Sequence, residues 1–236
     1  MCNRGRKARR PLISILCPSR GRPLWAKRMK ESALDTARGP VEVFFGCDED
    51  DITRKNYPDV FVTLPDWGYG YKAHALASLC NGDILFPIGD DTIFYTDGWD
   101  DSYREVAQAY PDGIFCICAD DNLQKLGTEK IGYPHPAVGR KWFEILGYVY
   151  HPMFIHFSGD RWLTDLARRV GRFHYLDSVV IAHHRVRSVA GIPKDETYRR
   201  IRNNKMISTR DEGVFLLSRR YMEVDAMKLI GEMDDV

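Results

Sequence analysis

The sequence predicts a single-domain α/β fold in which helices flank a mostly parallel central sheet. Over the first hundred residues, short apolar strands alternate with helical stretches, which is typical of a parallel sheet covered by helices. The chain has 236 residues, the length of one large domain or of one domain with extensions. Hydrophobic residues make up 44% of it and charged residues 28%, which excludes a wholly disordered chain.

In the first half, three of the predicted strands end in polar or charged residues. The periodicity predicts strands over 12–17, 41–47, 60–64 and 83–88, and helices over 25–37 and 71–80. The residues that follow these three strands are Pro18-Ser19-Arg20, Asp48-Glu49-Asp50 and Gly89-Asp90-Asp91. Ligands of such sheets bind beyond the carboxyl ends of the strands, so these tripeptides are the first candidates for a functional site.

The second half is less regular, and no linker divides it from the first. We expect helices over 99–110 and 138–146, a strand over 114–118, a helix from the N-cap Ser158 to Val170, and a strand over 173–182. Beyond Asp195 two helical stretches are expected. The predicted organisation is a basic N-terminal arm over 1–10, one domain over 11–210 and a C-terminal helical extension over 211–236.

Composition limits the compartment and the partners. Formal net charge is +1, yet the first thirty residues carry ten Lys and Arg side chains and no Asp or Glu. Such an arm meets a polyanion or is simply solvated. The six cysteines form no CxxC pair, which favours reduced buried thiols over a zinc knuckle or a disulfide framework. No apolar run is long enough for a transmembrane segment or a signal peptide, so we expect a cytoplasmic protein.

The acidic pair Asp90-Asp91 is the strongest single indication of chemistry. Two adjacent carboxylates at the end of a buried strand repel each other unless a cation lies nearby. A hard divalent metal shared with a phosphate group would supply that charge. The alternative is a solvated turn after the strand.

The order of these motifs resembles the nucleotide-sugar half of the GT-A glycosyltransferases, in particular the inverting family-2 type and its short phage-encoded members. Gly89-Asp90-Asp91 resembles the metal-binding DxD motif, with Gly89 in place of the first acid. The resemblance covers roughly residues 11–200. It implies a GT-A-like fold, with a nucleotide-sugar half over 11–100 and an acceptor half over 101–210. It also implies metal-dependent sugar transfer from a nucleotide diphosphate sugar with inversion.

The resemblance carries a metal site onto three residues. Asp91 is the best-matched ligand, Asp90 is its helper, and His183 at the end of the strand over 173–182 resembles the histidine that completes the site. Carboxylate, imidazole and diphosphate ligands suit Mn²⁺, with Mg²⁺ as the alternative. His184 points to the other face of the strand and is the second candidate.

The catalytic base is assigned in the same way. Phe157-Ser158-Gly159-Asp160 before a helix resembles the family's ED segment, whose Asp removes the acceptor proton. Asp160 is therefore the predicted base, although Gly159 replaces the usual Glu. A carboxylate in the first turn of a helix is also favourable for the helix dipole alone, and that is the competing interpretation.

At the nucleotide end, the resemblance assigns Pro18 and Arg20 to the first donor loop and Asp48 to the base. A carboxylate that accepts from a uracil N–H favours UDP over other nucleotides. Lys72 would reach a phosphate as a point charge. Trp67, Tyr69 and Tyr71 either stack on the donor or pack in the core.

Two other functions and two acceptors stay open. A nucleotidyltransferase uses a related sheet and metal, and a non-catalytic sugar- or nucleic-acid-binding module would explain the glycines at 89 and 159. For the acceptor, the basic arm and seven cations between residues 185 and 205 favour hydroxymethylpyrimidine in duplex DNA. A phage enzyme of that kind would act in the bacterial host cytoplasm. The alternative acceptor is a glycan.

Overall fold

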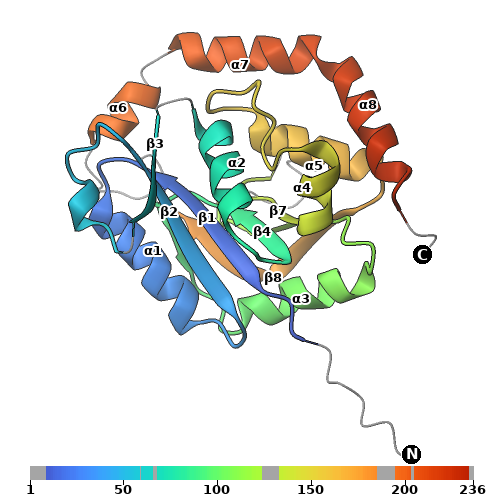
Figure 1. The fold of residues 1–236 in the computed structure, drawn as a ribbon, viewed down its shortest axis with the longest axis horizontal. Helices are drawn as coiled ribbons and strands as arrows, with labels where there is room; N and C mark the ends of the chain where they lie inside the picture. Colours follow the sequence, from blue (N-terminus) through green and yellow to red (C-terminus); the bar gives the residue numbers. More distant parts are fainter. Residues whose placement is uncertain are drawn as a thin grey trace, which may run out of the picture.

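The structure is a computed structural model that describes residues 9–58, 60–65, 68–123, 133–184, 195–202 and 205–233. Its centre is an eight-stranded sheet with strand order β3-β2-β1-β4-β7-β6-β8-β5, and helices cover both faces (Figure 1). The strands are β1 (Ile13–Ser19), β2 (Val41–Asp48), β3 (Val60–Leu64), β4 (Ile84–Pro87), β5 (Thr92–Phe94), β6 (Cys116–Asp120), β7 (Ala137–Gly139) and β8 (Phe173–His183). The α/β fold predicted from the sequence is confirmed.

The helices complete the alternation. They are α1 (Pro23–Asp35), α2 (Tyr69–Leu79), α3 (Trp99–Ala109), α4 (Arg140–Leu146), α5 (Gly159–Arg169), α6 (Glu196–Arg202), α7 (Lys205–Leu217) and α8 (Arg219–Ile230), with a short 3₁₀ helix over Arg54–Asn56. Pro23 starts α1, where its missing N–H costs no helical hydrogen bond. Asp160 lies in the first turn of α5 and Arg168 and Arg169 in the last, so both helix ends match the dipole.

The pairing directions decide where a site can lie. β1 is parallel to β2 and to β4, β2 to β3, and β6 to β8. Only β7, which is antiparallel to both β4 and β6, and β5, which is antiparallel to β8, run against this direction within the described sheet. The ends of β1, β2, β4, β6 and β8 therefore share one edge of the sheet, which we call the carboxyl edge.

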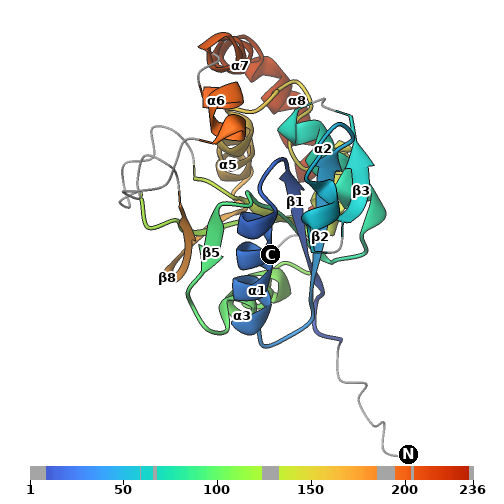
Figure 2. The same ribbon diagram turned by 90° about the vertical axis from the view of Figure 1, so that its left-hand side faces the viewer.

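Two apolar layers hold the sheet. On one face α1 and α3 pack Met29, Trp99 and Tyr103 against β1, β4 and β6. On the other face α2, α4, α5 and α8 pack around Trp142 and Trp162. Figure 2 shows the sheet curling, with β5 and β8 on one side of α1 and with β1 and β2 on the other. The curl brings the ends of β1 and β8 toward each other.

The C-terminal helices belong to this same core. Met222, Ala226 and Leu229 of α8 are buried in the second layer. The fully buried Asp211 carboxylate of α7 accepts hydrogen bonds from the backbone N–H groups of residues 155, 156 and 157, at 3.1, 2.9 and 2.8 Å. The predicted boundary between residues 210 and 211 falls inside α7.

Other differences from the sequence-based elements have simple reasons. β5 and β7 were not predicted as strands, because three residues are too few to show a period of two. The predicted helix over 138–146 begins as β7 and becomes helical only at Arg140. Three helices, not two, follow Asp195 in the described part of the chain. Ser158 is the N-cap of α5, but its side chain makes no capping hydrogen bond.

Two expectations from composition can be compared with the described residues. The five cysteines among them are buried and free. None of the helices in these parts of the chain combines the length and the hydropathy needed to cross a bilayer.

Candidate functional site

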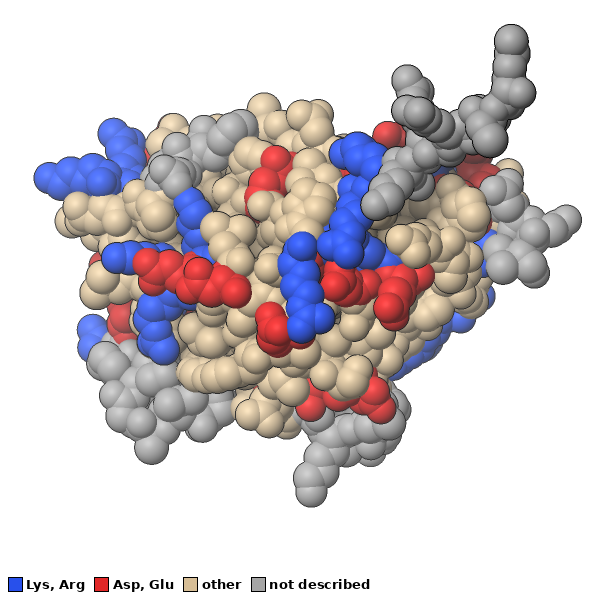
Figure 3. Space-filling view, turned by 90° about the horizontal axis from the view of Figure 1, so that it is seen from below, with Lys and Arg blue, Asp and Glu red and all other residues tan. Residues whose placement is uncertain are grey.

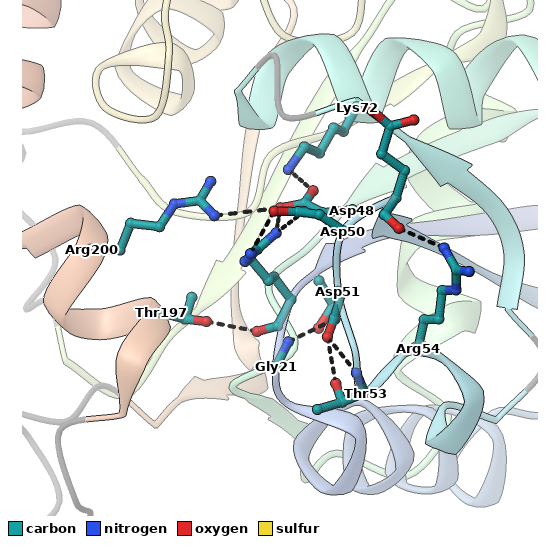
Figure 4. A network of polar contacts seen from close by, with 12 residues as sticks. Gly21, Asp48, Asp50, Asp51, Thr53, Arg54, Lys72, Thr197 and Arg200 are labelled. Atoms are coloured by element: carbon teal, nitrogen blue, oxygen red, sulfur yellow. Dashed lines mark hydrogen bonds and ion pairs between the residues drawn. The ribbon is translucent and has the colours of Figure 1, made fainter.

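The nucleotide end predicted from the sequence gathers around Asp48, the last residue of β2. Its side chain is completely buried. The Arg20 guanidinium donates to Asp48 Oδ2 at 3.0 Å, Lys72 Nζ binds Asp48 Oδ1, and Arg200 Nη1 lies 3.7 Å from Oδ2 (Figure 4). Arg20 also pairs with Asp50. Three cations, from the turn after β1, from α2 and from α6, thus surround one buried carboxylate, which offsets the cost of burying it.

The predicted residues of this end differ in their surroundings. Arg20 and Lys72 meet at Asp48, but Lys72 is nearly buried and its ammonium group is bound to that carboxylate. Its contact with a phosphate stays a prediction. Pro18 lies inside β1, opposite Gly46 of β2. Tyr69 is half-buried against the apolar layer around Trp142 and Trp162 and Tyr71 is exposed, so stacking on a donor stays a prediction for both. Trp67 lies outside the described residues.

Helix α6 closes over this end of the sheet. Thr197 Oγ1 donates to the carbonyl oxygen of Arg20 at 2.7 Å, and Arg200 reaches Asp48 from the same helix (Figure 4). Beneath it, Asp51 accepts from the backbone N–H of Gly21 at 2.9 Å and from Thr53. The turn after β1 is therefore held on one side by the acidic run after β2 and on the other by α6.

The predicted metal end lies at the carboxyl edge between β4 and β8. Asp91 Oδ1 is 3.2 Å from His183 Nε2, and the His183 ring centroid is 4.6 Å from that of His135. The backbone N–H of His184 donates to the carbonyl oxygen of Asp91 at 2.7 Å, but its ring turns away and bonds the Tyr95 hydroxyl at 3.2 Å. His183, and not His184, thus shares the Asp91 carboxylate.

Asp90 faces a different set of partners. Its carboxylate accepts a hydrogen bond from the Ser19 hydroxyl and forms an ion pair with Arg22, with Nη1 at 3.2 Å from Oδ1. The same Arg22 nitrogen is 3.7 Å from Asp91 Oδ2. Arg22 also makes a two-pronged bridge to Asp195, with Nε to Oδ2 at 2.6 Å and Nη2 to Oδ1 at 2.9 Å. The positive charge that an acidic pair requires is supplied here by a guanidinium group.

Burial and charge separate the two carboxylates. Burial raises the pKa of Asp90 above the usual carboxyl range, an effect opposed by the charge of Arg22 and reinforced by that of Asp91. Burial also acts to raise the pKa of Asp91, but His183 and Arg22 outweigh it and hold that pKa below its ordinary value. Asp91 is therefore the member of the pair that the protein keeps ionised most firmly.

Asp91 and His183 are chemically suitable ligands for a divalent metal, and their side chains lie together, with Oδ1 and Nε2 3.2 Å apart. A carboxylate and an imidazole are donors that suit Mn²⁺ and Mg²⁺ to different degrees. Across the described residues, no group of three or more His, Cys, Asp and Glu side chains is arranged to hold a metal ion. The role of Asp90 as a third ligand stays a prediction, since its carboxylate is bound to Ser19 and Arg22.

Asp160 lies in the first turn of α5. Its Oδ1 accepts from the backbone N–H of Arg161 at 2.8 Å. Burial raises the pKa of the Tyr69 hydroxyl, and Cys17, Asp90, Asp91 and Asp160 add to this effect in that order. The role of Asp160 beside the predicted metal end stays a prediction.

The two glycines that depart from the family motifs have different surroundings. A Cβ atom on Gly159 would lie 2.4 Å from Cδ1 of the buried Tyr150 ring, so this position has no room for the usual Glu. A Cβ atom on Gly89 would meet Asp91 Oδ1 at 2.8 Å and otherwise only His135. The missing acid at 89 would thus have pointed at Asp91, whereas the missing acid at 159 is excluded by packing.

Several residues of this site were not assigned from the sequence. Ser19 belongs to the Pro18-Ser19-Arg20 tripeptide at the end of β1 and Arg22 follows it two residues later, so their position in the chain was the only available signal. His135 has a left-handed backbone, with φ of 54°, which no sequence pattern indicated. Asp195 and Arg200 reach the site through α6, from about 175 residues beyond β1. Only tertiary structure reveals such distant partners.

Comparisons with known proteins agree on the fold. No family model and no curated protein matches the sequence. Among solved structures, a mannosyltransferase, PcManGT from Pyrobaculum calidifontis in complex with GDP-Man and Mn²⁺, is 12% identical over 94% of this chain and 74% of its own, with a TM-score of 0.59. TarS of S. aureus is 11% identical over 72% of this chain, with a TM-score of 0.54.

TarS has also been solved as residues 1–349 with UDP and with UDP-GlcNAc, at TM-scores of 0.54. The present chain spans 36% of the first TarS chain and 59% of the UDP complex. At such low identities the likeness establishes the fold. It is the Rossmann-like α/β fold found in glycosyltransferases.

The packing at Gly159 gives a prediction about stability. Replacing Gly159 with Ala should lower the free energy of unfolding by about 1–3 kcal/mol, since the new methyl group overlaps the buried Tyr150 ring. Gly213 of α7 is the matched control, because a Cβ atom there meets nothing within 4 Å. Gly213→Ala should leave stability unchanged or raise it by up to about 1 kcal/mol through helix propensity. Urea unfolding measures both variants, and equal effects would contradict the packing argument.

Proposed function

We propose that this protein is a glycosyltransferase that moves a sugar from a nucleotide diphosphate sugar, with UDP as the nucleotide, to an acceptor hydroxyl with inversion. The observation that carries the proposal is the Asp91–His183 pair at the carboxyl edge. The same edge holds the ion pairs around the buried Asp48 carboxylate. The fold supports it, because structures similar to this one hold UDP, UDP-GlcNAc or GDP-Man with Mn²⁺.

The donor would lie along the carboxyl edge from β2 to β8. Asp48 and Arg20 provide an acceptor and a donor of hydrogen bonds at the β2 end, which suits the edge of a uracil base. Arg200 adds positive charge at the same point, where it favours an anionic ligand. Lys72 forms an ion pair with Asp48, which offsets the cost of burying this carboxylate.

The diphosphate would lie at the β4–β8 end. Asp91 Oδ1 and His183 Nε2 are the protein atoms that would hold Mn²⁺ or Mg²⁺ there. A divalent ion so held would supply Lewis-acid stabilisation of the departing diphosphate. The remaining task of the chain is to orient the acceptor and to take its proton.

Asp160 is the group proposed to take that proton. Its place in the first turn of α5 favours the charged carboxylate, which can accept a proton but does so weakly in the ground state. Asp211 fixes the backbone of residues 155–157 just before α5, so the position of Asp160 depends on a buried and well-bonded loop. Positioning of this kind is what a general base requires.

Asp160→Asn tests the role of the base. The variant should bind UDP within a few-fold of the parent, because Asp160 does not belong to the donor end, and should lose about 10²–10⁴ in turnover. Turnover is measured as UDP release and as sugar transfer across a panel of nucleotide sugars. Asp165→Asn, on the same helix and facing Arg161 and Arg168, is the control and should keep full turnover.

The alternatives give different results in the same assay. A nucleotidyltransferase would turn over nucleoside triphosphates and leave sugar nucleotides intact, and a binding module would turn over neither. If Asp160→Asn turns over as fast as the parent, Asp160 is only a first-turn carboxylate and the base lies elsewhere.

For the acceptor we propose hydroxymethylpyrimidine in duplex DNA, and the support comes from the sequence. Residues 1–8 and 185–194, which hold much of the basic charge, lie outside the described residues. At the base of the arm, Arg9 pairs with Asp83 and Arg10 lies 3.6 Å from Asp101. On the face shown in Figure 3, basic and acidic side chains are interleaved. The arm, and not that face, would therefore provide the phosphate contacts.

A gel-shift titration with salt tests this acceptor. If the arm contacts phosphates, binding to duplex DNA should fall steeply as salt rises, and exchanging Arg4 and Arg6 for Gln should lower the slope of log K against log salt by about 2. Exchanging Arg219 and Arg220 of α8 for Gln is the control and should leave the slope unchanged. Absence of DNA binding at low salt, with no transfer to hydroxymethylated duplex, would leave a glycan as the acceptor.

A further inference from the structure

Arg22 is a largely buried cation that has no role in the proposed reaction. Its side chain is only 12% exposed, although it stands in a surface turn between β1 and α1. One nitrogen, Nη1, faces both carboxylates of the acidic pair, at 3.2 Å from Asp90 and 3.7 Å from Asp91. Asp91 is also the carboxylate that lies 3.2 Å from His183. A guanidinium group therefore stands beside the Asp91–His183 pair.

The other two nitrogens of the Arg22 guanidinium hold it in this position. Nε and Nη2 bind the two oxygens of Asp195 in the paired geometry that fixes a guanidinium plane. Asp195 immediately precedes α6, and α6 is itself tied to the turn after β1 through Thr197. The orientation of Arg22 over the acidic pair is thus set by a residue outside that pair.

A guanidinium and a divalent ion cannot both occupy this place without cost. Each is attracted by the same carboxylates, and the two positive charges repel each other in a largely buried setting where screening by solvent is weak. A cation that already occupies the site weakens the binding of a second one, because displacing the first cation costs free energy.

We propose that Arg22 is the resident counter-cation of the Asp90–Asp91 pair, and that a divalent ion binds at Asp91 and His183 only in competition with its guanidinium group. Asp195 acts as a positioning residue that holds Arg22 in the competing orientation. This inference rests on the metal site of the proposed function, but it concerns the protein in the absence of donor. It implies a site that holds metal weakly until the diphosphate adds its own negative charge.

The test measures binding of Mn²⁺ alone, by electron paramagnetic resonance titration without nucleotide. Arg22→Gln should bind Mn²⁺ at least about tenfold more tightly than the parent. Arg38→Gln removes the same charge from a guanidinium that is paired with Asp97, away from the acidic pair, and should leave the Mn²⁺ affinity near that of the parent. Equal or weaker binding by Arg22→Gln would overturn the proposal.

Asp195→Asn separates competition from simple electrostatics. Removing a nearby negative charge should weaken binding of any cation if only the net charge matters. If Asp195 holds Arg22 over the pair, the same change should tighten Mn²⁺ binding, by about threefold or more, and should have no such effect when Arg22 is already Gln. Weaker binding by Asp195→Asn in the parent background would overturn the positioning role.

The second variant also protects the test against misfolding, because the Asp195 side chain is about one-third exposed and the variant keeps the positive charge of Arg22 in the protein. None of these measurements uses a sugar nucleotide. A failure of sugar transfer would therefore leave their outcome unaffected, and equal Mn²⁺ affinities would leave the transfer assay of Asp160→Asn to be judged separately.

Discussion

Neutralisation of buried acids at the carboxyl edge is the constraint on which the rest of this structure depends. Parallel strands bring the ends of β2 and β4 to one edge, and both ends carry carboxylates that are almost completely buried. A buried charge is costly unless a partner neutralises it. Cations from distant segments of the chain pair with these carboxylates, namely Arg20, Arg22, Lys72 and Arg200. The fold around the site is therefore an arrangement of counter-charges. In our proposal a divalent ion competes with these cations for the carboxylates, and an anionic donor would compete with the carboxylates for the cations.

This view explains why the C-terminal helices are integral to the domain. α6 provides Thr197 and Arg200 to the nucleotide end, and Asp195, just before it, binds Arg22 at the metal end. Asp211 of α7 fixes the loop that precedes α5 and Asp160. The two halves of the candidate site are joined by this segment, so movement of α6 would affect both ends together.

How far the sequence predicted the molecule depends on the range of each interaction. Strands β1, β2 and β4 and the polar residues at their ends followed from local hydrophobic patterns, and the structure brings these strand ends to one edge of the sheet. β5 and β7 are too short to carry a pattern, and Pro18 was expected in a loop but lies inside β1. The Arg22–Asp195 bridge joins residues 173 positions apart, and no local signal specifies such a pair. The sequence predicted a divalent metal beside Asp90 and Asp91, and it did not predict the Arg22 guanidinium that the structure places next to both carboxylates.

The metal end proposed at Asp91 and His183 is tested most directly by calorimetric titration of UDP in the presence and absence of Mn²⁺. We expect the parent protein to bind UDP, and Mn²⁺ to strengthen this binding by at least about tenfold. Asp91→Asn should abolish the gain from Mn²⁺ while retaining the metal-free affinity. Asp50→Asn, at an exposed carboxylate next to Arg20, should keep the gain. Binding of UDP that is unaffected by Mn²⁺ in the parent, or a gain that survives in Asp91→Asn, would contradict the assignment of the metal end.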